Sequence, residues 1–294
     1  MRIVYVIIGC DTDPDRAGYL ESVKPGKLSW RGMTEGIPRV KELVHGLTDH
    51  RGHEPVFTWL LRVDEQIKVI HGAYNWVPAT HRDFLLDLEK TGDELGWHPH
   101  FWRQDTASGE WYQEINDTDW QIEMLEQAHR AYLEVLPGRT HSVRMGWAYH
   151  TNRTFQTLDK LGVKVEFSAL PGLRTLSAKS GTRSENLFDW FTTPRAPYYP
   201  SREDYRRPAK GREAALGTLE VPSFTSRSLF WGLAGGIQLM RKMKSPTQFI
   251  QALRRPTYAH RAPEIIRSAG RAITSGFTPD KRGSDFLFHV LSCR

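Results

Sequence analysis

Two histidines that are separated by one residue, His98 and His100, follow a short apolar run and could together bind a metal ion. Histidine is the commonest metal ligand among side chains, and residues i and i+2 of an extended backbone point to the same face. The alternative is an aromatic surface cluster, because Trp97 and Trp102 lie beside the two histidines. These four residues alone favour neither interpretation.

Acidic residues follow the first apolar run of the chain and could complete such a site. Asp11, Asp13 and Asp15 come at every second position after residues 3–10. Carboxylates together with imidazoles favour a hard or borderline divalent ion. The alternative is structural, because the sequence Asp-Thr-Asp-Pro is also well suited to capping a turn. Whether Asp13 or Asp15 would be the metal ligand stays open.

Apolar runs alternate with helical patterns along most of the chain, and these elements must position the candidate residues. Seven strands are expected, at residues 3–10, 56–61, 94–97, 142–148, 163–167, 219–221 and 285–291. Helices are expected at residues 37–50, 78–92, between 116 and 137, and at 155–162, with two further helical pieces in 241–271. This β-α-β-α order predicts a parallel sheet, either an open doubly wound sheet or a closed barrel.

Residues that directly follow the strands are expected to meet in space, because the ligand site of a parallel α/β sheet lies at the carboxyl ends of its strands. The residues that meet this criterion are Asp11, Asp13, Arg62, Asp64, His98, His100, Trp147, His150 and Ser223. Acids after the first strand and paired histidines after the third predict a divalent metal with mixed Asp and His ligation.

The composition is that of a globular protein with a sizeable core, and we expect residues 1–294 to form one domain. There are 40 Lys and Arg against 34 Asp and Glu; the net charge of +6 favours anionic partners without specifying one. With Cys10 and Cys293 as the two cysteines, a disulfide framework is not expected. The run 3–8 is too short for a signal peptide or membrane span, so a cytoplasmic protein is expected.

Six short motifs follow one another in an order that resembles the polysaccharide deacetylase family, the metal-dependent carbohydrate N-deacetylases of the NodB-homology type. The motifs are Cys10-Asp-Thr-Asp13, Pro55-Val-Phe-Thr-Trp-Leu-Leu61, Leu95-Gly-Trp-His98, Val143-Arg-Met-Gly-Trp147, Leu187-Phe-Asp-Trp190 and Phe286-Leu-Phe-His289. The resemblance covers nearly the whole chain. It implies a distorted (β/α)7 barrel of the polysaccharide deacetylase type.

Several positions depart from the family pattern. The family's two histidines usually stand four residues apart, but position 102 is Trp, which makes His100 the expected second ligand. Thr12 separates two acids that are adjacent in the family, and Asn186 stands where the first acid of the acid-tryptophan motif is expected. These differences indicate a divergent branch, with an unusual substrate or without activity.

The resemblance also implies roles for individual residues. A divalent ion, most simply Zn²⁺, would be bound by Asp13, His98 and His100, and would activate water and polarise an amide carbonyl. Asp11 would be the catalytic base, and Arg144 would orient it and favour its charged form. His289 would donate a proton to the leaving amine. A lone histidine in an apolar strand is otherwise a core residue, and Arg144 could equally be a structural ion-pair partner.

The expected partner is a carbohydrate, because aromatic faces beside a hydrolytic site stack on sugar rings. The candidate substrate-binding residues are Arg62, Trp97, Trp147, Asp189, Trp190 and Tyr199. The tryptophans could instead be core residues. The basic segment 241–271 could contact the phosphate of a nucleotide- or lipid-linked sugar or a membrane surface, although a solvated helix face is the default. Nucleic acid is not expected, since no binding motif accompanies the charge.

The function expected from these residues is metal-dependent removal of an N-acyl group, most simply acetyl, from an amino sugar or sugar conjugate. One alternative is a carbohydrate-binding relative that has lost its metal chemistry. Another is a glycosidase that uses the carboxylates directly on a glycosidic bond.

Overall fold

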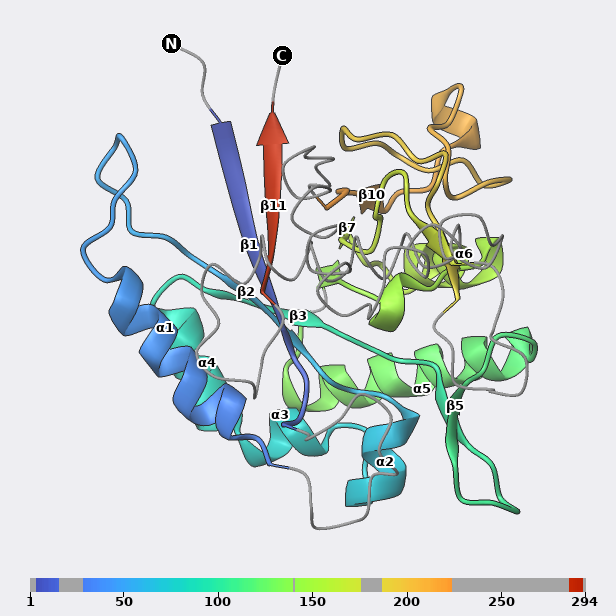
Figure 1. The fold of residues 1–294 in the computed structure, drawn as a ribbon, viewed down its shortest axis with the longest axis horizontal. Helices are drawn as coiled ribbons and strands as arrows, with labels where there is room; N and C mark the ends of the chain where they lie inside the picture. Colours follow the sequence, from blue (N-terminus) through green and yellow to red (C-terminus); the bar gives the residue numbers. More distant parts are fainter. Residues whose placement is uncertain (1–3, 16–28, 140, 176–186, 224–285, 293–294) are drawn as a thin grey trace, which may run out of the picture.

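A seven-stranded sheet forms the centre of the protein in this computed structural model (Figure 1). The structure describes residues 4–15, 29–139, 141–175, 187–223 and 286–292. The strands of the sheet are β1 (Val4–Thr12), β2 (Thr58–Leu61), β3 (Glu94–Trp97), β6 (Ser142–Val143), β7 (Val165–Glu166), β10 (Leu219–Glu220) and β11 (Phe286–Ser292). All seven lie where the sequence predicts a strand.

The order of the strands is β10-β7-β6-β3-β2-β1-β11. Six of them, from β1 to β10, pair in parallel with their neighbours in chain order. Each crossover therefore moves one strand in the same direction, as in a barrel, whereas a doubly wound sheet reverses direction. The result is a mixed α/β fold with a curled parallel half-barrel, as expected for the deacetylase-type barrel.

The last strand differs from the expectation of a uniformly parallel sheet. β11 runs antiparallel to β1, with Val4 opposite Ser292 and Cys10 opposite Phe286. The two strands lie side by side in Figure 1. Their antiparallel pairing means that the carboxyl end of β11 lies at the opposite end of the sheet from the carboxyl ends of the six parallel strands.

Helices follow the strands and cover the sheet. They are η1 (Gly32–Gly36, a π-helical turn), α1 (Ile37–Val44), α2 (Glu65–His71), α3 (Trp76–Thr80), α4 (Arg82–Lys90), α5 (Thr118–Val135) and α6 (Asn152–Lys160). The longest, α5, begins at the N-cap Asp117, whose carboxylate accepts the Trp120 N–H at 3.0 Å. Its buried face, with Met124, Leu125 and Tyr132, packs into the main core, as the apolar spacing predicts.

Some elements were not expected from the sequence. Helix α2 follows β2 directly, and two hairpins leave the main sheet: β4 (Trp102–Gln104) with β5 (Trp111–Gln113), and β8 (Arg174–Thr175) with β9 (Phe188–Asp189). A 3-10 turn, η2 (Gly146–Ala148), replaces the end of the strand expected at 142–148, and a second, η3 (Arg212–Ala214), precedes β10. The basic segment 241–271 lies outside the described residues.

Candidate metal centre

Two carboxylates project from the carboxyl end of β1 on one side of the strand. Asp11 pairs with Leu60 of β2, and Asp13 is the first residue after β1. Successive side chains of a strand alternate between faces, so the single Thr12 between the acids puts both carboxylates on one face. The Asp11 and Asp13 side chains are 15% and 33% exposed. The spacing that departs from the family pattern therefore still brings both acids to one site.

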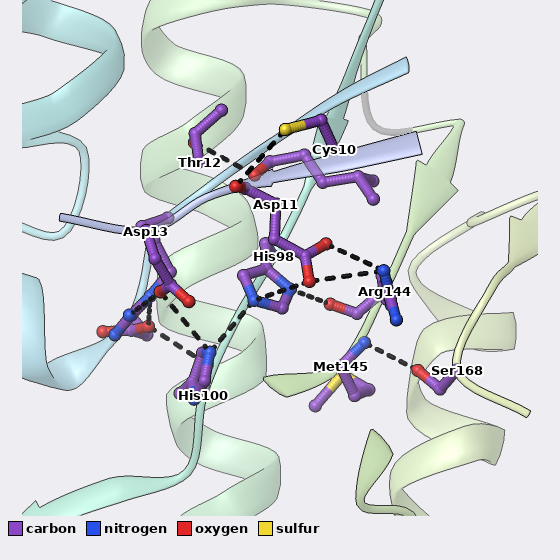
Figure 2. A network of polar contacts seen from close by, with 12 residues as sticks. Cys10, Asp11, Thr12, Asp13, His98, His100, Arg144, Met145 and Ser168 are labelled. Atoms are coloured by element: carbon purple, nitrogen blue, oxygen red, sulfur yellow. Dashed lines mark hydrogen bonds and ion pairs between the residues drawn. The ribbon is translucent and has the colours of Figure 1, made fainter. Parts of the chain in front are cut away.

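The two histidines lie beyond β3 and face these acids (Figure 2). The His98 N–H donates to the Leu61 carbonyl at 2.7 Å, which continues the pairing of β3 with β2. The Nε2 atoms of His98 and His100 are 3.0 Å apart, and both rings are buried. The i and i+2 spacing thus directs both imidazoles toward one point, as the sequence predicts.

The tautomer of His98 is set by its second ring nitrogen. Its Nδ1 lies 2.6 Å from the carbonyl oxygen of Arg144. A carbonyl can only accept, so Nδ1 carries a hydrogen, and in the neutral ring Nε2 presents a lone pair to the space shared with His100 and Asp13. A histidine that ligates a metal typically donates its other N–H in this way.

Asp13, His98 and His100 form a possible metal site. One ligand atom from each residue lies within 4.8 Å of the others, and His100 Nε2 is 3.7 Å from Asp13 Oδ1. In a tetrahedral zinc site with bonds of about 2.0 Å, ligand atoms are separated by about 3.3 Å. The donor set of two imidazoles and one carboxylate fits such an ion. Asp15 is instead engaged by the backbone N–H of Gly32, at 3.0 Å.

Arg62 lies behind the acids as a fully buried cation. Its guanidinium donates to Asp13, to Asp64 at 2.7 Å and to Gln66 at 3.0 Å. Burial alone would lower the pKa of Arg62, but Asp64 and Asp13 outweigh it and raise that pKa above its ordinary value. The side chain of Arg62, which was expected at the substrate, is enclosed and holds the candidate ligand Asp13.

Asp64 connects the start of α2 to the second histidine. One carboxylate oxygen accepts the Ile67 N–H at 3.1 Å and thereby caps the helix. The other accepts both the Arg62 Nε–H and the backbone N–H of His100, at 3.1 Å. Asp64 therefore positions the backbone of His100.

Arg144 stands beside Asp11 at the carboxyl end of β6. Its Nη1 lies 3.3 Å from both Asp11 oxygens, and Asp11 Oδ2 is 3.7 Å from His98 Nε2. A partly exposed carboxylate thus lies next to the possible metal site with a buried guanidinium against it. This is the arrangement expected of a base with an orienting cation.

The turn after β6 supports His100. A Cβ atom on Gly146 would lie 2.1 Å from Cγ of the His100 ring, so that only glycine fits there. Trp147 and Ala148 both have left-handed backbones, with φ of 58° and 56°. The Trp147 ring meets the His100 ring edge-on, and the Trp102 ring stacks parallel to it, with centroids 6.3 Å away in each case. Trp102, which stands where the family pattern has a histidine, therefore packs against His100 at the edge of the site.

Two tryptophans that were expected at the substrate are core residues. Trp97 is fully buried in the main core, and its Nε1–H donates to the Val63 carbonyl at 2.9 Å. Trp190 is fully buried in a second core and donates to the Ala148 carbonyl at 2.7 Å. Both rings therefore occupy core positions, the alternative that the sequence also allowed.

Three other expected residues lie outside the group of acids and histidines. The Asp189 carboxylate, in the hairpin β8–β9, is paired with Arg206. Tyr199 is 53% exposed. His289 pairs with Ile7 in β11, four residues before Asp11, which is about 13 Å along the strand. The structure does not bring His289 to Asp11, because the register places His289 opposite Ile7, in the middle of the paired stretch of β1 and β11.

A buried polar group was missed at the ends of β7 and β10. Glu166 and Glu220 lie directly opposite each other on these strands, and both are fully buried. Ser168 donates both its O–H and, at 2.8 Å, its N–H to Glu166. The available signal was an acidic residue inside each of two short apolar strands, where a charge is costly unless it is paired.

The pKa values of the two carboxyl groups are shifted in opposite directions. Burial would raise the pKa of Glu166, but the adjacent Glu220, His150 and Ser168 lower it to about 2. Burial and the adjacent Glu166 raise the pKa of Glu220 well above its ordinary value. Glu220 Oε1 accepts the Ala169 N–H at 3.0 Å, whereas no described donor reaches Oε2. The two opposite shifts are those expected of two adjacent buried carboxyl groups of which only one is ionised.

The solved structures that match this chain include two proteins described as deacetylases. No protein-family model and no curated protein matches the chain significantly. A proposed glycoside hydrolase/deacetylase from Parabacteroides distasonis is 19% identical, with a TM-score of 0.45, over 76% of this chain and 45% of that one. A proposed polysaccharide deacetylase from Mycobacterium smegmatis is 12% identical, with a TM-score of 0.32, over 60% and 42%. The chain thus matches less than half the length of either neighbour.

Among the described residues, no helix combines the length and the apolar character needed to cross a membrane.

Proposed function

We propose that this protein is a metal-dependent hydrolase that removes an N-acyl group, most simply acetyl, from an amino sugar or sugar conjugate. One observation carries the proposal: the possible metal ligands Asp13, His98 and His100 lie together, with Asp11 and Arg144 directly beside them. This arrangement combines a place for a Lewis acid with a partly exposed carboxylate, which is what amide hydrolysis by activated water requires.

The metal would be held by one carboxylate oxygen and two imidazole nitrogens, a donor set suited to zinc. When bound, such an ion supplies a Lewis acid that activates water and polarises an acyl carbonyl. Arg62 and Asp64 serve this set from behind, because Arg62 donates to Asp13 and Asp64 accepts the backbone N–H of His100. Arg62 and Asp64 therefore hold Asp13 and His100 in place in the metal-free protein.

Asp11 is the group placed to take up a proton in this reaction. It is partly exposed, and its Oδ2 lies 3.7 Å from His98 Nε2, at the edge of the ligand set. The adjacent Arg144 guanidinium compensates its negative charge and limits the directions in which the carboxylate can turn. Trp147, which packs against His100, is the aromatic side chain best placed to border a sugar ring there.

Metal binding is the first test. Calorimetric titration of the metal-free protein with Zn²⁺ is expected to give one tight site per chain, and His98→Ala or Asp13→Asn is expected to abolish it. His53→Ala is the control, because His53 is exposed and belongs to a surface ion pair with Asp49. Absence of a tight site in the native protein, or equal loss in the His53 variant, would contradict the proposal.

Turnover is the second test and separates the alternatives. Native protein loaded with zinc is expected to release acetate from N-acetylated amino-sugar oligomers without shortening them. Asp11→Asn is expected to keep the zinc and lose about 10²- to 10⁴-fold in rate, since it removes a proton acceptor. Oligomer cleavage would indicate a glycosidase, and sugar binding without acetate release would indicate a non-catalytic relative.

A further inference from the structure

The peptide group between Arg144 and Met145 is held on both of its sides (Figure 2). Its carbonyl oxygen, on Arg144, lies 2.6 Å from His98 Nδ1, and its N–H, on Met145, donates to Ser168 Oγ at 2.8 Å. A trans peptide group is planar, with its N–H and C=O pointing in opposite directions. The orientation of the N–H therefore sets the orientation of the carbonyl, and Ser168 reaches His98 through one rigid group.

Ser168 is itself fixed by Glu166. The Ser168 hydroxyl donates to one oxygen of the Glu166 carboxylate, and the Ser168 backbone N–H donates to the other at 2.8 Å. Both residues are fully buried. A hydroxyl has one hydrogen to donate, so its commitment to Glu166 leaves a lone pair for the Met145 N–H.

Glu166 is in turn held as a carboxylate by its neighbours. Glu220 lies opposite it on β10, and His150 Nε2 is 3.3 Å from Glu166 Oε1. Glu220 also accepts the Ala169 N–H, which fixes it against the turn that contains Ser168. Three strands, β6, β7 and β10, thus contribute to one continuous set of contacts that ends at His98.

We propose that Ser168, anchored by Glu166, is a positioning residue that sets the tautomer and the direction of the His98 ring. The inference rests on the metal-ligand role proposed for His98. It assigns Ser168 and Glu166 a function in metal binding although neither touches the ion. Loss of a group that hydrogen-bonds a metal-ligating histidine typically costs 10- to 100-fold in affinity, and Ser168 is one hydrogen bond further from the ion, so a loss at the lower end, about 10-fold, is expected.

Ser223 provides a matched control. It follows β10 as Ser168 follows β7, and it is also buried. Its Oγ has no hydrogen-bond partner among the described residues, and its backbone N–H donates to the Ala169 carbonyl at 2.9 Å. Ser223→Ala therefore removes the same atoms from a neighbouring buried position without interrupting the contacts that lead to His98.

The test compares Ser168→Ala with Ser223→Ala and the native protein in two measurements. In Zn²⁺ titrations, Ser168→Ala is expected to lower affinity by about 10-fold, whereas Ser223→Ala stays near native affinity. In ¹⁵N NMR of the metal-free proteins, the Nδ1–H tautomer of His98 is expected to dominate in the native protein and in Ser223→Ala, and to decline in Ser168→Ala. An unchanged tautomer in Ser168→Ala would overturn the proposal.

Ser168→Cys is the milder variant if Ser168→Ala does not fold. A thiol is a weak donor and a weak acceptor, so it is expected to give an intermediate tautomer population. A native population would overturn the proposal here as well. Because the NMR measurement needs no metal and no substrate, it stays decisive if the native protein binds no zinc, an outcome that would defeat the proposed function instead.

Discussion

Gly146 shows how tightly a single position can be tied to the candidate metal centre. Its α-carbon lies against the His100 imidazole, and an added Cβ would come within 2.1 Å of the ring. The ring cannot withdraw easily, because Trp102 and Trp147 pack against it. Any side chain at position 146 must therefore move either the turn or the ligand.

We predict that Gly146→Ala displaces the His100 ring and weakens Zn²⁺ binding by at least about 10-fold, as expected when a ligand loses its orientation. Gly36→Ala is the control, since a Cβ there meets nothing within 4 Å. Calorimetric titration of both variants measures the effect. If Gly146→Ala binds Zn²⁺ with native affinity, the orientation of the His100 ring does not depend on a glycine at position 146.

Some residues of the site could be predicted from the sequence and others could not, for a physical reason. Asp13, His98 and His100 follow from the alternation of side chains on strands and from the rule that strand ends meet. Ser168 and Glu166 act through hydrogen bonds that depend on side-chain rotamers, which no sequence period encodes. The burial of Arg62 depends likewise on Asp13 and Asp64, which are brought to it by different segments.

At the scale of elements, the Arg62 guanidinium links the end of β2 to the start of α2 through Asp64. The same Asp64 links them to the end of β3. Arg62 follows β2, its partner Asp64 caps α2, and the same Asp64 accepts the backbone N–H of His100. Removing one partner of a buried ion pair is strongly destabilising, because it leaves the other charge buried and uncompensated. Removing one partner of an exposed ion pair has little effect on stability, because water solvates the remaining charge.

We predict that Arg62→Met lowers the free energy of unfolding by about 3–5 kcal/mol, because it leaves Asp64 without its cation. Arg31→Met is the control: Arg31 and Glu35 are 72% and 61% exposed, and the unfolding midpoint should barely move. Urea denaturation of the metal-free proteins measures both. Similar midpoints in the two variants would contradict the assigned role of Arg62.

The elements themselves were predictable where an apolar pattern is uninterrupted. The strand expected at 142–148 ends at Val143, because the chain turns at Gly146 and takes a left-handed backbone at Trp147 and Ala148. The hairpin β4–β5 was missed because its six residues carry no apolar alternation that marks a buried face. The parallel half-barrel was predictable, whereas the antiparallel entry of β11 was not, since an isolated apolar run does not encode its direction.

For the whole molecule, the buried carboxyl pair couples folding to pH. Glu220 faces Glu166 on β7, and Arg144 and Tyr198 also lie within its electrostatic influence. Its pKa is raised above the ordinary 4.5, so the stability that it contributes is present below that value and is lost as the pH rises toward its folded-state pKa. The pKa of Glu166 is lowered from 4.5 to about 2, so the stability that Glu166 contributes is present above pH 4.5 and is lost as the pH falls toward about 2.

We predict that Glu220→Gln, which keeps a hydrogen-bond donor but cannot ionise, gains stability relative to the native protein as the pH rises above 4.5. Glu213→Gln, at an exposed position in η3, should instead parallel the native protein. Thermal unfolding in the presence of a chelator measures the difference at each pH. A constant difference between Glu220→Gln and the native protein would show that Glu220 does not titrate in this range.

The pairing of β1 with β11 has a practical consequence for handling the protein. Val4 and Ser292 are opposite each other, whereas Asp11 and the other strand ends that carry the candidate site lie at the other end of the sheet. A tether attached before Val4 or after Ser292 would therefore leave the fold at the same place, facing away from the candidate metal centre. Protein immobilised on a sensor chip by either route should present that centre to the flowing analyte.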